Sequence, residues 1–412
     1  MTRTEASGEQ RVRRVWRRSV IVGIWVLLAV LISMHSLNGL KPQALESAAH
    51  DPAVYQEVPS GYVVAPVSAA VQPLDRLLLI NFEDHNDSLY VGLEPQVVAD
   101  PQQGYGLLVV AWRIDGYVDV YHQPGLRLEP STYEIAGSGL HQMLERPLTD
   151  AYLEITAAGV DTFFAFEDIL GRDITVRIQE TSSRTRRPFP LLAPMGDAVS
   201  EPTSLPLVVL DDFYFVRRSG TMAELEIAGE PVELGSLPIP MDLQRMYFLR
   251  YSPDPLIVKL NPAHDGVLPL LSGEPEESES VQFVLVDNFG YTEISQMRVS
   301  HGAMVLDFEP PLPNVVDLRD GVMVNGTFKI HGSTGFGTVG GVYSFQRSGH
   351  NVNVLMTPSH GWQPRTNKVS LWLLYAVQPL FRTWPQTYIW EAVLDTADLD
   401  AIHMQSQWRR SR

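Results

Sequence analysis

The chain has 412 residues, with 48 acidic and 31 basic side chains, a formal net charge of −17 and no cysteine. This length is enough for two or more folding units. The acidic balance disfavours a nucleic-acid-binding function, because phosphate backbones attract basic proteins. The lack of cysteine excludes disulfides, thiolate metal sites, iron–sulfur clusters and a cysteine nucleophile.

The first element in chain order is an apolar run that follows a basic segment. Five arginines lie within residues 11–18, and no charged residue occurs between Arg18 and Lys41. Residues 19–40 are long enough for one transmembrane helix, and the basic tail 1–18 predicts a cytoplasmic N-terminus and an extracytoplasmic body in the cell membrane. A cleaved signal peptide is the alternative, but the small residues at 47–49 lie well beyond the apolar core, which favours an uncleaved anchor.

The segment after the apolar run is proline-rich, with five prolines in residues 41–75, and we expect it to form a stalk. Residues 41–412 together hold 25 basic and 46 acidic side chains, a balance of −21. An anionic membrane surface repels such a body, so we expect it to be tethered to the membrane without lying on it.

Most segments after residue 76 alternate apolar and polar residues with period two, as half-buried strands do. Helical spacing is confined to residues 139–146, an ambiguous stretch near 369–381, and a turn after Thr396. Turn sequences such as Ile114-Asp-Gly-Tyr117 and Arg347-Ser-Gly349 predict hairpins between strands. We therefore predict an all-β protein of two antiparallel barrel or sandwich domains. The alternating segments are 117–122, 173–180, 222–228 and 351–356, and longer apolar runs at 77–82, 107–114, 205–216 and 281–286 predict strands buried on both faces.

Two irregular stretches can divide the body. Residues 181–206 are rich in proline, and residues 261–280 are acidic without a periodic apolar set. Strand-like segments on both sides of the first stretch share one rhythm, so we place the boundary in the second. This predicts a first β domain at 76–260, an acidic linker at 261–280 and a second β domain at 281–412, with 181–206 as an elaborated loop.

Local motifs give little support for a metal or cofactor site. Gly335-Phe-Gly-Thr-Val-Gly340 matches the dinucleotide fingerprint, but a strand-like segment follows where the motif needs a helix, so we expect a glycine-rich hairpin loop. Residues 82–87 gather three carboxylates and a histidine without the register of a calcium loop, which favours a solvated turn. The eleven histidines contain no zinc-binding pair, and we predict no metal and no cofactor.

Several side chains are candidates for ligand binding or catalysis. Asp211 and Asp212 end a long apolar run, where partial burial can prepare a carboxylate as an acid or base; the alternative is a strand end with both acids in water. The last fifth of the chain is rich in aromatic residues, which either line an apolar cavity or close a β core. His122 shares a face with Val118 and Val120 and is either an interior side chain or a ligand contact. For a binding protein, the predicted ligand contacts are Trp372, Tyr375, Trp390 and His122.

Four segments within about 150–260 resemble the carotenoid 1,2-hydratase-like family: residues 160–178, Tyr214-Phe-Val-Arg-Arg-Ser-Gly-Thr-Met222, residues 228–235, and Met241-Asp242. The resemblance implies a lipocalin-related fold with two β-barrel-like domains. It also implies that Asp242 occupies the place of a catalytic proton donor. Pro240 stands where that family has a tryptophan, so the resemblance supports the fold more than the catalysis.

These observations predict a membrane-anchored, extracytoplasmic, non-catalytic binding protein for an apolar small molecule or lipid, since barrels of about eight strands enclose one small ligand. One alternative is a hydratase- or isomerase-type enzyme that acts on an apolar substrate, with Asp242 as proton donor and Asp211 or Asp212 assisting. Another is a cell-envelope structural or assembly partner that binds protein through exposed β edges or through the 181–206 loop.

Overall fold

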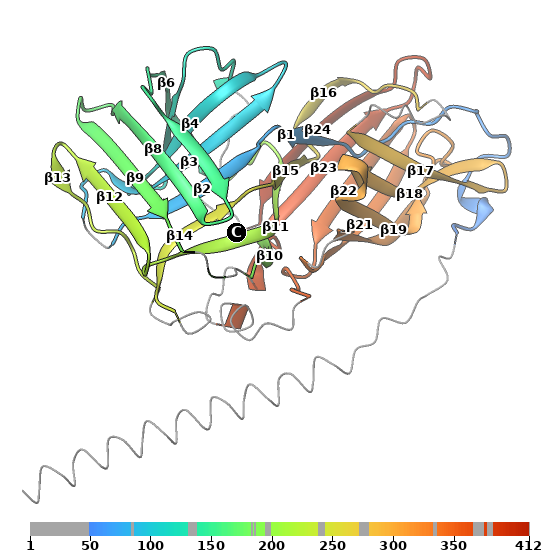
Figure 1. Ribbon diagram of the computed structural model, residues 1–412. Helices are drawn as coiled ribbons and strands as arrows, with labels where there is room; N and C mark the ends of the chain where they lie inside the picture. The colour runs from blue at the N-terminus through green and yellow to red at the C-terminus, as the bar shows by residue number, and fades with distance from the viewer. Residues whose placement is uncertain are drawn as a thin grey trace, which may run out of the picture. The chain divides into compact units, whose positions relative to one another are not determined.

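A computed structural model describes residues 49–83, 86–130, 138–182, 184, 187–193, 199–237, 244–271, 280–332, 336–365, 375–376 and 382–411 (Figure 1). This part of the protein is all-β, as predicted, with no helix of seven or more residues. The expected anchor at 19–40, Asp242 and Trp372 lie outside it. In the described ranges, no helix is both long and apolar enough to span a bilayer.

Residues 49–75, expected to belong to a stalk, are part of the folded unit. The chain forms a 3₁₀ turn, η1 (Pro52–Val54), and then β1 (Ala69–Gln72), which pairs with β15 (Pro255–Leu260). Tyr55 is buried, and its hydroxyl donates to Glu293 Oε1 at 2.7 Å. The buried Tyr55 and the pairing of β1 with β15 therefore attach this segment to strands that are distant in sequence.

The described strands form three sheets, of which the largest has ten strands in the order β1-β15-β11-β14-β2-β3-β4-β5-β6, with β10 also paired to β11. All of its pairs are antiparallel except β5 with β6. Its central part joins β2 to β14, strands far apart in sequence. The remaining strands of this sheet are β2 (Arg76–Asn81), β3 (Tyr90–Asp100), β4 (Gly104–Arg113), β5 (Val118–His122), β6 (Leu140–Glu145), β10 (Phe189–Ala193), β11 (Leu205–Arg217) and β14 (Met246–Ser252).

The segment 139–146, predicted to be helical, is instead the edge strand β6. Parallel pairing with β5 satisfies its backbone. Leu140 and Met143 pack against a small core that contains Val118 and Val120. This tertiary packing outweighs a weak helical spacing of three apolar residues.

A five-stranded sheet, in the order β13-β12-β9-β8-β7, packs one face against the ten-stranded sheet. The predicted alternation at 173–180 is confirmed, because Ile174, Val176 and Ile178 are fully buried and point into the shared core. Facing them are residues such as Leu93 and Val109 of the larger sheet. The strands of the smaller sheet are β7 (Tyr152–Thr156), β8 (Gly159–Glu167), β9 (Asp173–Glu180), β12 (Thr221–Ile227) and β13 (Glu230–Pro231).

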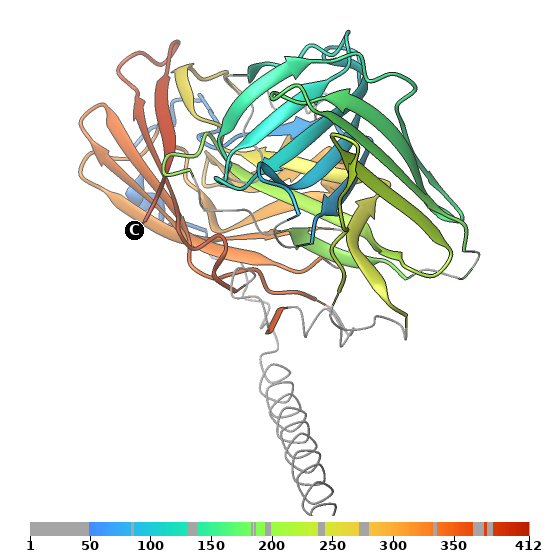
Figure 2. The ribbon, with the colours of Figure 1, turned by 90° about the vertical axis from the view of Figure 1, so that its left-hand side faces the viewer.

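The third sheet has nine strands, and from β17 to β24 each strand pairs with the next in sequence. Figure 2 shows the curl of this sheet in its orange and red strands. Its edge strand β16 (His264–Val267) lies inside the predicted linker 261–280 and pairs with β24. The other strands are β17 (Val281–Asn288), β18 (Tyr291–Val299), β19 (Met304–Leu312), β20 (Met323–His331), β21 (Val339–Ser348), β22 (Asn351–Pro358), β23 (Tyr388–Asp395) and β24 (His403–Arg410), with a 3₁₀ turn, η3 (Ser300–Gly302), between β18 and β19.

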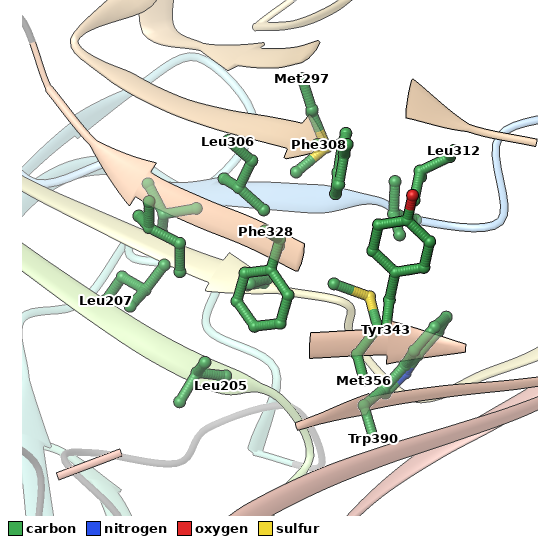
Figure 3. Packing of buried hydrophobic residues seen from close by; sticks show 14 of the residues in the cluster. Leu205, Leu207, Met297, Leu306, Phe308, Leu312, Phe328, Tyr343, Met356 and Trp390 are labelled. Atoms are coloured by element: carbon green, nitrogen blue, oxygen red, sulfur yellow. The ribbon is translucent and has the colours of Figure 1, made fainter. Parts of the chain in front are cut away.

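The largest core includes strands from both sides of the 261–280 segment. Leu205 and Leu207 of β11 belong to the same cluster as Phe308, Phe328 and other side chains of the nine-stranded sheet (Figure 3). Burying these groups together removes a large apolar area from water, and each Å² of buried apolar area stabilises the fold by roughly 25 cal/mol. β11 therefore contributes both to the ten-stranded sheet and to the core of the nine-stranded sheet.

Candidate functional site

Of the predicted ligand contacts that the structure describes, Trp390 and Tyr375 belong to or pack against the largest core, and His122 lies apart from them. Trp390 of β23 is 0% exposed in the largest core, and Tyr375 is half-buried with its ring centroid 6.3 Å from that of Trp362. His122 lies at the end of β5, outside that core, with Nδ1 3.1 Å from the carbonyl oxygen of Gln123. The described members of the predicted set thus share no single site.

The two candidate carboxylates of β11 lie inside the strand and not at its end. Asp211 is half-buried and Asp212 is exposed. The register of β11 with β10 shifts between Leu210 and Phe213, so both carboxylates lie at a bulge in the strand. Their catalytic role stays a prediction.

The described residues contain no group of three or more histidine or acidic side chains placed to hold a metal ion. The glycine motif at 335–340 leads into a strand, since β21 begins at Val339 and Gly337 adopts φ of +103° beside the Gln363 carbonyl. A side chain at Gly337 would meet that oxygen, so a close backbone approach explains the glycine. The hairpin-loop interpretation of this motif is confirmed.

A pocket of about 600 Å³ opens where three segments between residues 182 and 245 meet. Its walls come from the segment after β9, the turn between β11 and β12, and the residues before β14. The lining residues are Ser182, Arg184, Arg218, Ser219, Gln244 and Arg245.

Arg217, which is only 4% exposed, builds the first wall of this pocket. Its Nη1 donates to Ser182 Oγ at 2.7 Å, and its Nη2 donates to the Arg184 carbonyl oxygen at 2.7 Å. Its backbone N–H donates to Glu180 Oε1 at 3.2 Å. A buried guanidinium in its fixed fork geometry therefore holds Ser182 and Arg184 against the end of β11.

Further hydrogen bonds join the remaining walls. The Thr181 N–H donates to the Gly220 carbonyl at 2.8 Å, and the Arg218 N–H donates to the Arg245 carbonyl at 3.0 Å. The Arg218 guanidinium lies 5.1 Å from the centroid of the Tyr247 ring. The pocket is thus organised before any ligand arrives.

The electrostatics of the pocket are opposite to those of the whole protein. Arg184, Arg218 and Arg245 are exposed, and none of the three forms an ion pair within the described part of the chain. Guanidinium groups match carboxylates and phosphates in bidentate geometry. Three guanidinium groups without an ion-pair partner among the described residues, beside serine hydroxyls and a glutamine amide, therefore have the chemistry of an anion site. No local motif predicts this site, although arginine is concentrated at 184–187, 217–218 and 245 in an acidic chain.

A second polar cluster is buried between the ten- and five-stranded sheets. Asp119, which is 0% exposed, accepts from Arg113 Nη1 at 3.0 Å and from the Tyr90 hydroxyl at 3.1 Å, and its Oδ1 lies 2.7 Å from His141 Nδ1. The Tyr90 and Tyr121 hydroxyl oxygens are 2.7 Å apart. Burial raises the pKa of Tyr121 to about 12 and raises that of Tyr90 further. Because its buried members are already partnered, this cluster stabilises the fold and offers no free group to a ligand.

Comparison of the chain with family models, curated proteins and solved structures finds no match. The functional assignment therefore depends on the geometry of the pocket and on the sequence.

Proposed function

We propose that this protein is a non-catalytic binding protein whose ligand carries a phosphate or carboxylate group, held by Arg184, Arg218 and Arg245. The observation that carries the proposal is the meeting in one pocket of three guanidinium groups that form no ion pair with any residue the structure describes, in a strongly acidic protein. A volume of about 600 Å³ is within the usual range for small-molecule sites. The hydrogen bonds of Arg217 reduce the cost of ordering the site on binding.

The N-terminal sequence supports an extracytoplasmic location for the body of this binding protein, tethered to the cell membrane by residues 19–40. We further propose that its curled sheets form two lipocalin-like domains. An apolar ligand that carries an anionic group would combine the ligand predicted from the sequence with the chemistry of the pocket. The anion has two possible sources, a soluble phosphate compound or the headgroup of a lipid.

Isothermal titration of the full chain in lipid nanodiscs of neutral lipid tests this proposal with two probes, inorganic phosphate and short-chain phosphatidic acid. Arg218→Gln and Arg245→Gln are each expected to weaken binding at least tenfold, because each removes a charge-assisted contact. Binding should also weaken with added salt, since the guanidinium groups are exposed. Binding of both probes indicates a site for the anion alone, and binding of phosphatidic acid alone indicates that the acyl chains are needed.

Arg409→Gln is the matched control, because Arg409 is equally exposed but already paired with Glu391 at 2.6 Å. It should leave the affinity for both probes unchanged. The proposal fails if neither probe binds the unmodified protein, or if Arg409→Gln weakens binding as much as Arg218→Gln does.

A further inference from the structure

The turn between β17 and β18 carries the most exposed large apolar side chain in the described part of the chain. Asn288 pairs with Tyr291, so Phe289 and Gly290 form the two-residue loop of this hairpin. Phe289 is 81% exposed. Burial in the core therefore does not account for a phenylalanine at this position.

The backbone of the loop is also unfavourable for a phenylalanine. Phe289 adopts φ of +54° and Gly290 adopts φ of +93°. Hairpin loops with two such residues favour Asn-Gly or Asp-Gly, and a bulky side chain with positive φ is a rare exception. Strained positions of this kind are concentrated where function requires them. Phe289 is therefore explained neither by turn chemistry nor by packing, which points to a contact outside the folded chain.

Hydrogen bonds and a ring contact hold this hairpin against the first described residues of the chain. Asn288 Nδ2 donates to the His50 carbonyl oxygen at 2.9 Å and to Glu293 Oε1 at 2.7 Å. The same oxygen of Glu293, a residue that is 0% exposed, accepts from the Tyr55 hydroxyl at 2.7 Å. The Tyr55 ring stacks on that of Tyr291 with the centroids 4.4 Å apart. The loop is thus fixed beside the segment that begins at His50.

A second exposed apolar side chain lies on that segment. Val58 is 74% exposed, and a Cβ added at Gly290 would lie 3.7 Å from Cγ of Pro59, the residue that follows Val58. Phe289 and Val58 therefore belong to one region of the surface. We refer to these two side chains as the apolar tip.

We propose that the apolar tip enters the interfacial layer of a lipid membrane, a contact that rests on the tether proposed above and not on the anion site. Only residues 41–48 separate the proposed tether from Ala49, and an extended chain spans at most about 3.6 Å per residue. Ala49 therefore lies within roughly 30 Å of the end of the tether. Because Asn288 contacts His50, Phe289 is held close to the point at which the tether reaches the folded body. Phenylalanine and aliphatic side chains are typical of surfaces that enter the boundary between headgroups and acyl chains.

The charges around the apolar tip favour a neutral membrane surface. Asp51, Glu57 and Asp287 are exposed on the two segments that carry the tip. Arg319, which donates its N–H to the Val54 carbonyl oxygen at 2.9 Å, is exposed as well, and the balance of these four groups is acidic. An anionic surface repels such a region, whereas a zwitterionic surface does not. We therefore expect the tip to enter phosphatidylcholine membranes and to withdraw in part when anionic lipid is added.

Quenching by lipid tests this contact on the full chain in phosphatidylcholine nanodiscs. Because the chain has no cysteine, Phe289→Cys provides a single thiol for a nitrobenzoxadiazole fluorophore. A nitroxide on the upper part of the lipid acyl chains should reduce the fluorescence of this label at least twofold. Leu170→Cys is the matched control, since Leu170 is 62% exposed in the turn between β8 and β9, and its label should keep its fluorescence. Equal quenching of the two labels would overturn the proposal.

A second pair of variants removes the apolar side chain without disturbing the turn. Phe289→Asn suits positive φ, so the fold should be retained. In the Phe289→Asn background, a label at Val58→Cys should be quenched less by lipid than it is when Phe289 is present. Unchanged quenching at position 58 would contradict a joint entry of the two side chains.

Two further readouts separate the possible failures. A label at position 289 that is shielded from aqueous iodide but not quenched by lipid would indicate a contact with protein, such as a second copy of the chain, and would overturn the proposal. If the chain does not co-elute with the nanodiscs, both the tether and the membrane contact of the tip are refuted. If it co-elutes and the label at position 289 stays unquenched, the tether stands and the membrane contact alone is refuted.

Discussion

The strands before residue 261 and those after it pair in different ways. In the nine-stranded sheet, from β17 onward, each strand pairs with its neighbour in sequence, and the interior is filled by large side chains such as Trp390 and Trp408. In the ten-stranded sheet, β2 to β6 also pair in sequence order, but β1 pairs with β15 and β2 pairs with β14, strands far apart in the chain.

The two regions also differ in where the candidate site lies. Trp390 and Trp408 have ring centroids 6.5 Å apart inside the packed core of the second region. The first region holds the pocket of Arg184, Arg218 and Arg245, which form no ion pair with any described residue. Within the described part of the chain, buried polar atoms without a hydrogen-bond partner occur in both regions, for example Arg250 Nε and Glu293 Oε2, so such atoms do not by themselves mark a ligand site.

The largest expected effect tests the structural role of the second region. Trp390→Ala should destabilise the protein by about 3–5 kcal/mol, because it leaves a large cavity in a fully packed core. The midpoint of urea unfolding measures this, with Trp390→Phe as a control that should lose less. A stable Trp390→Ala variant with altered ligand affinity would instead support Trp390 as a ligand contact and erase the contrast between the regions.

A somewhat smaller effect is expected at the polar cluster of the first region. Asp119→Asn removes the negative charge that Arg113 and His141 share. Because it leaves Arg113 without its buried partner, we expect a loss of about 3 kcal/mol in the free energy of unfolding. Asp115→Asn is the control, since Asp115 pairs with the same arginine at the surface and should cost less than about 1 kcal/mol. Equal losses for the two variants would show that the burial of Asp119 adds nothing to the contribution of its ion pair to the free energy of unfolding.

The third prediction concerns the pH dependence of the first region. Burial raises the pKa of Glu94 in the folded state above its ordinary value of 4.5, so the folded protein holds this proton more tightly than the unfolded chain does. Stability therefore falls as the pH rises from the ordinary value through the raised one. Glu94→Gln should remove this loss and raise the free energy of unfolding at pH 8 by about 1 kcal/mol. If the variant is less stable than the unmodified protein at pH 8, the hydrogen bonds from Gln96 and Trp112 stabilise the fold only when they are donated to a charged carboxylate.

The smallest expected effect is at Asp307 in the second region, where the pKa is lowered and not raised. The hydrogen bond from His331 at 2.7 Å lowers the pKa of Asp307 below its ordinary value of 3.8. Stability from this group is present above the ordinary value and is lost as the pH falls through the lowered one. Asp307→Asn should therefore reduce stability at pH 6 by well under about 1 kcal/mol, because both side chains are about one-third exposed and solvent screens them. The unfolding curves of the variant and of the unmodified protein should differ at pH 6 and lie closer together at pH 3.

The period-two pattern predicted the strands of hairpins correctly because each of them pairs with a neighbour in sequence. The segments 173–180 and 351–356 correspond to β9 and β22, and the turn at 347–349 joins β21 to β22. The pattern missed β1 and β6, which are short, edge-forming strands whose burial depends on distant partners. Hydrophobic periodicity describes one strand at a time and carries no information about such partners.

The candidate site was less predictable than the fold, because its parts meet only through tertiary pairing. Arg184 and Arg245 are 61 residues apart in the sequence and reach one pocket through the pairing of β9 with β12 and of β11 with β14. Side-chain type alone directed attention to acidic and aromatic residues, and the structure places Trp390 inside a core. Asp242 and Trp372 lie outside the described residues, and their roles stay predictions.

The order of strands in the ten-stranded sheet has a consequence for biosynthesis. The Ser68 N–H reaches Asn261, 193 residues further along the chain, and β2 pairs with β14. In a growing polypeptide, β1 therefore has no strand partner until β15 has left the ribosome, and β2 has one side unpaired until β14 has left it. The strands after residue 280 can instead form hairpins as they emerge. Protection of those early strands from aggregation is needed during this interval and not afterwards.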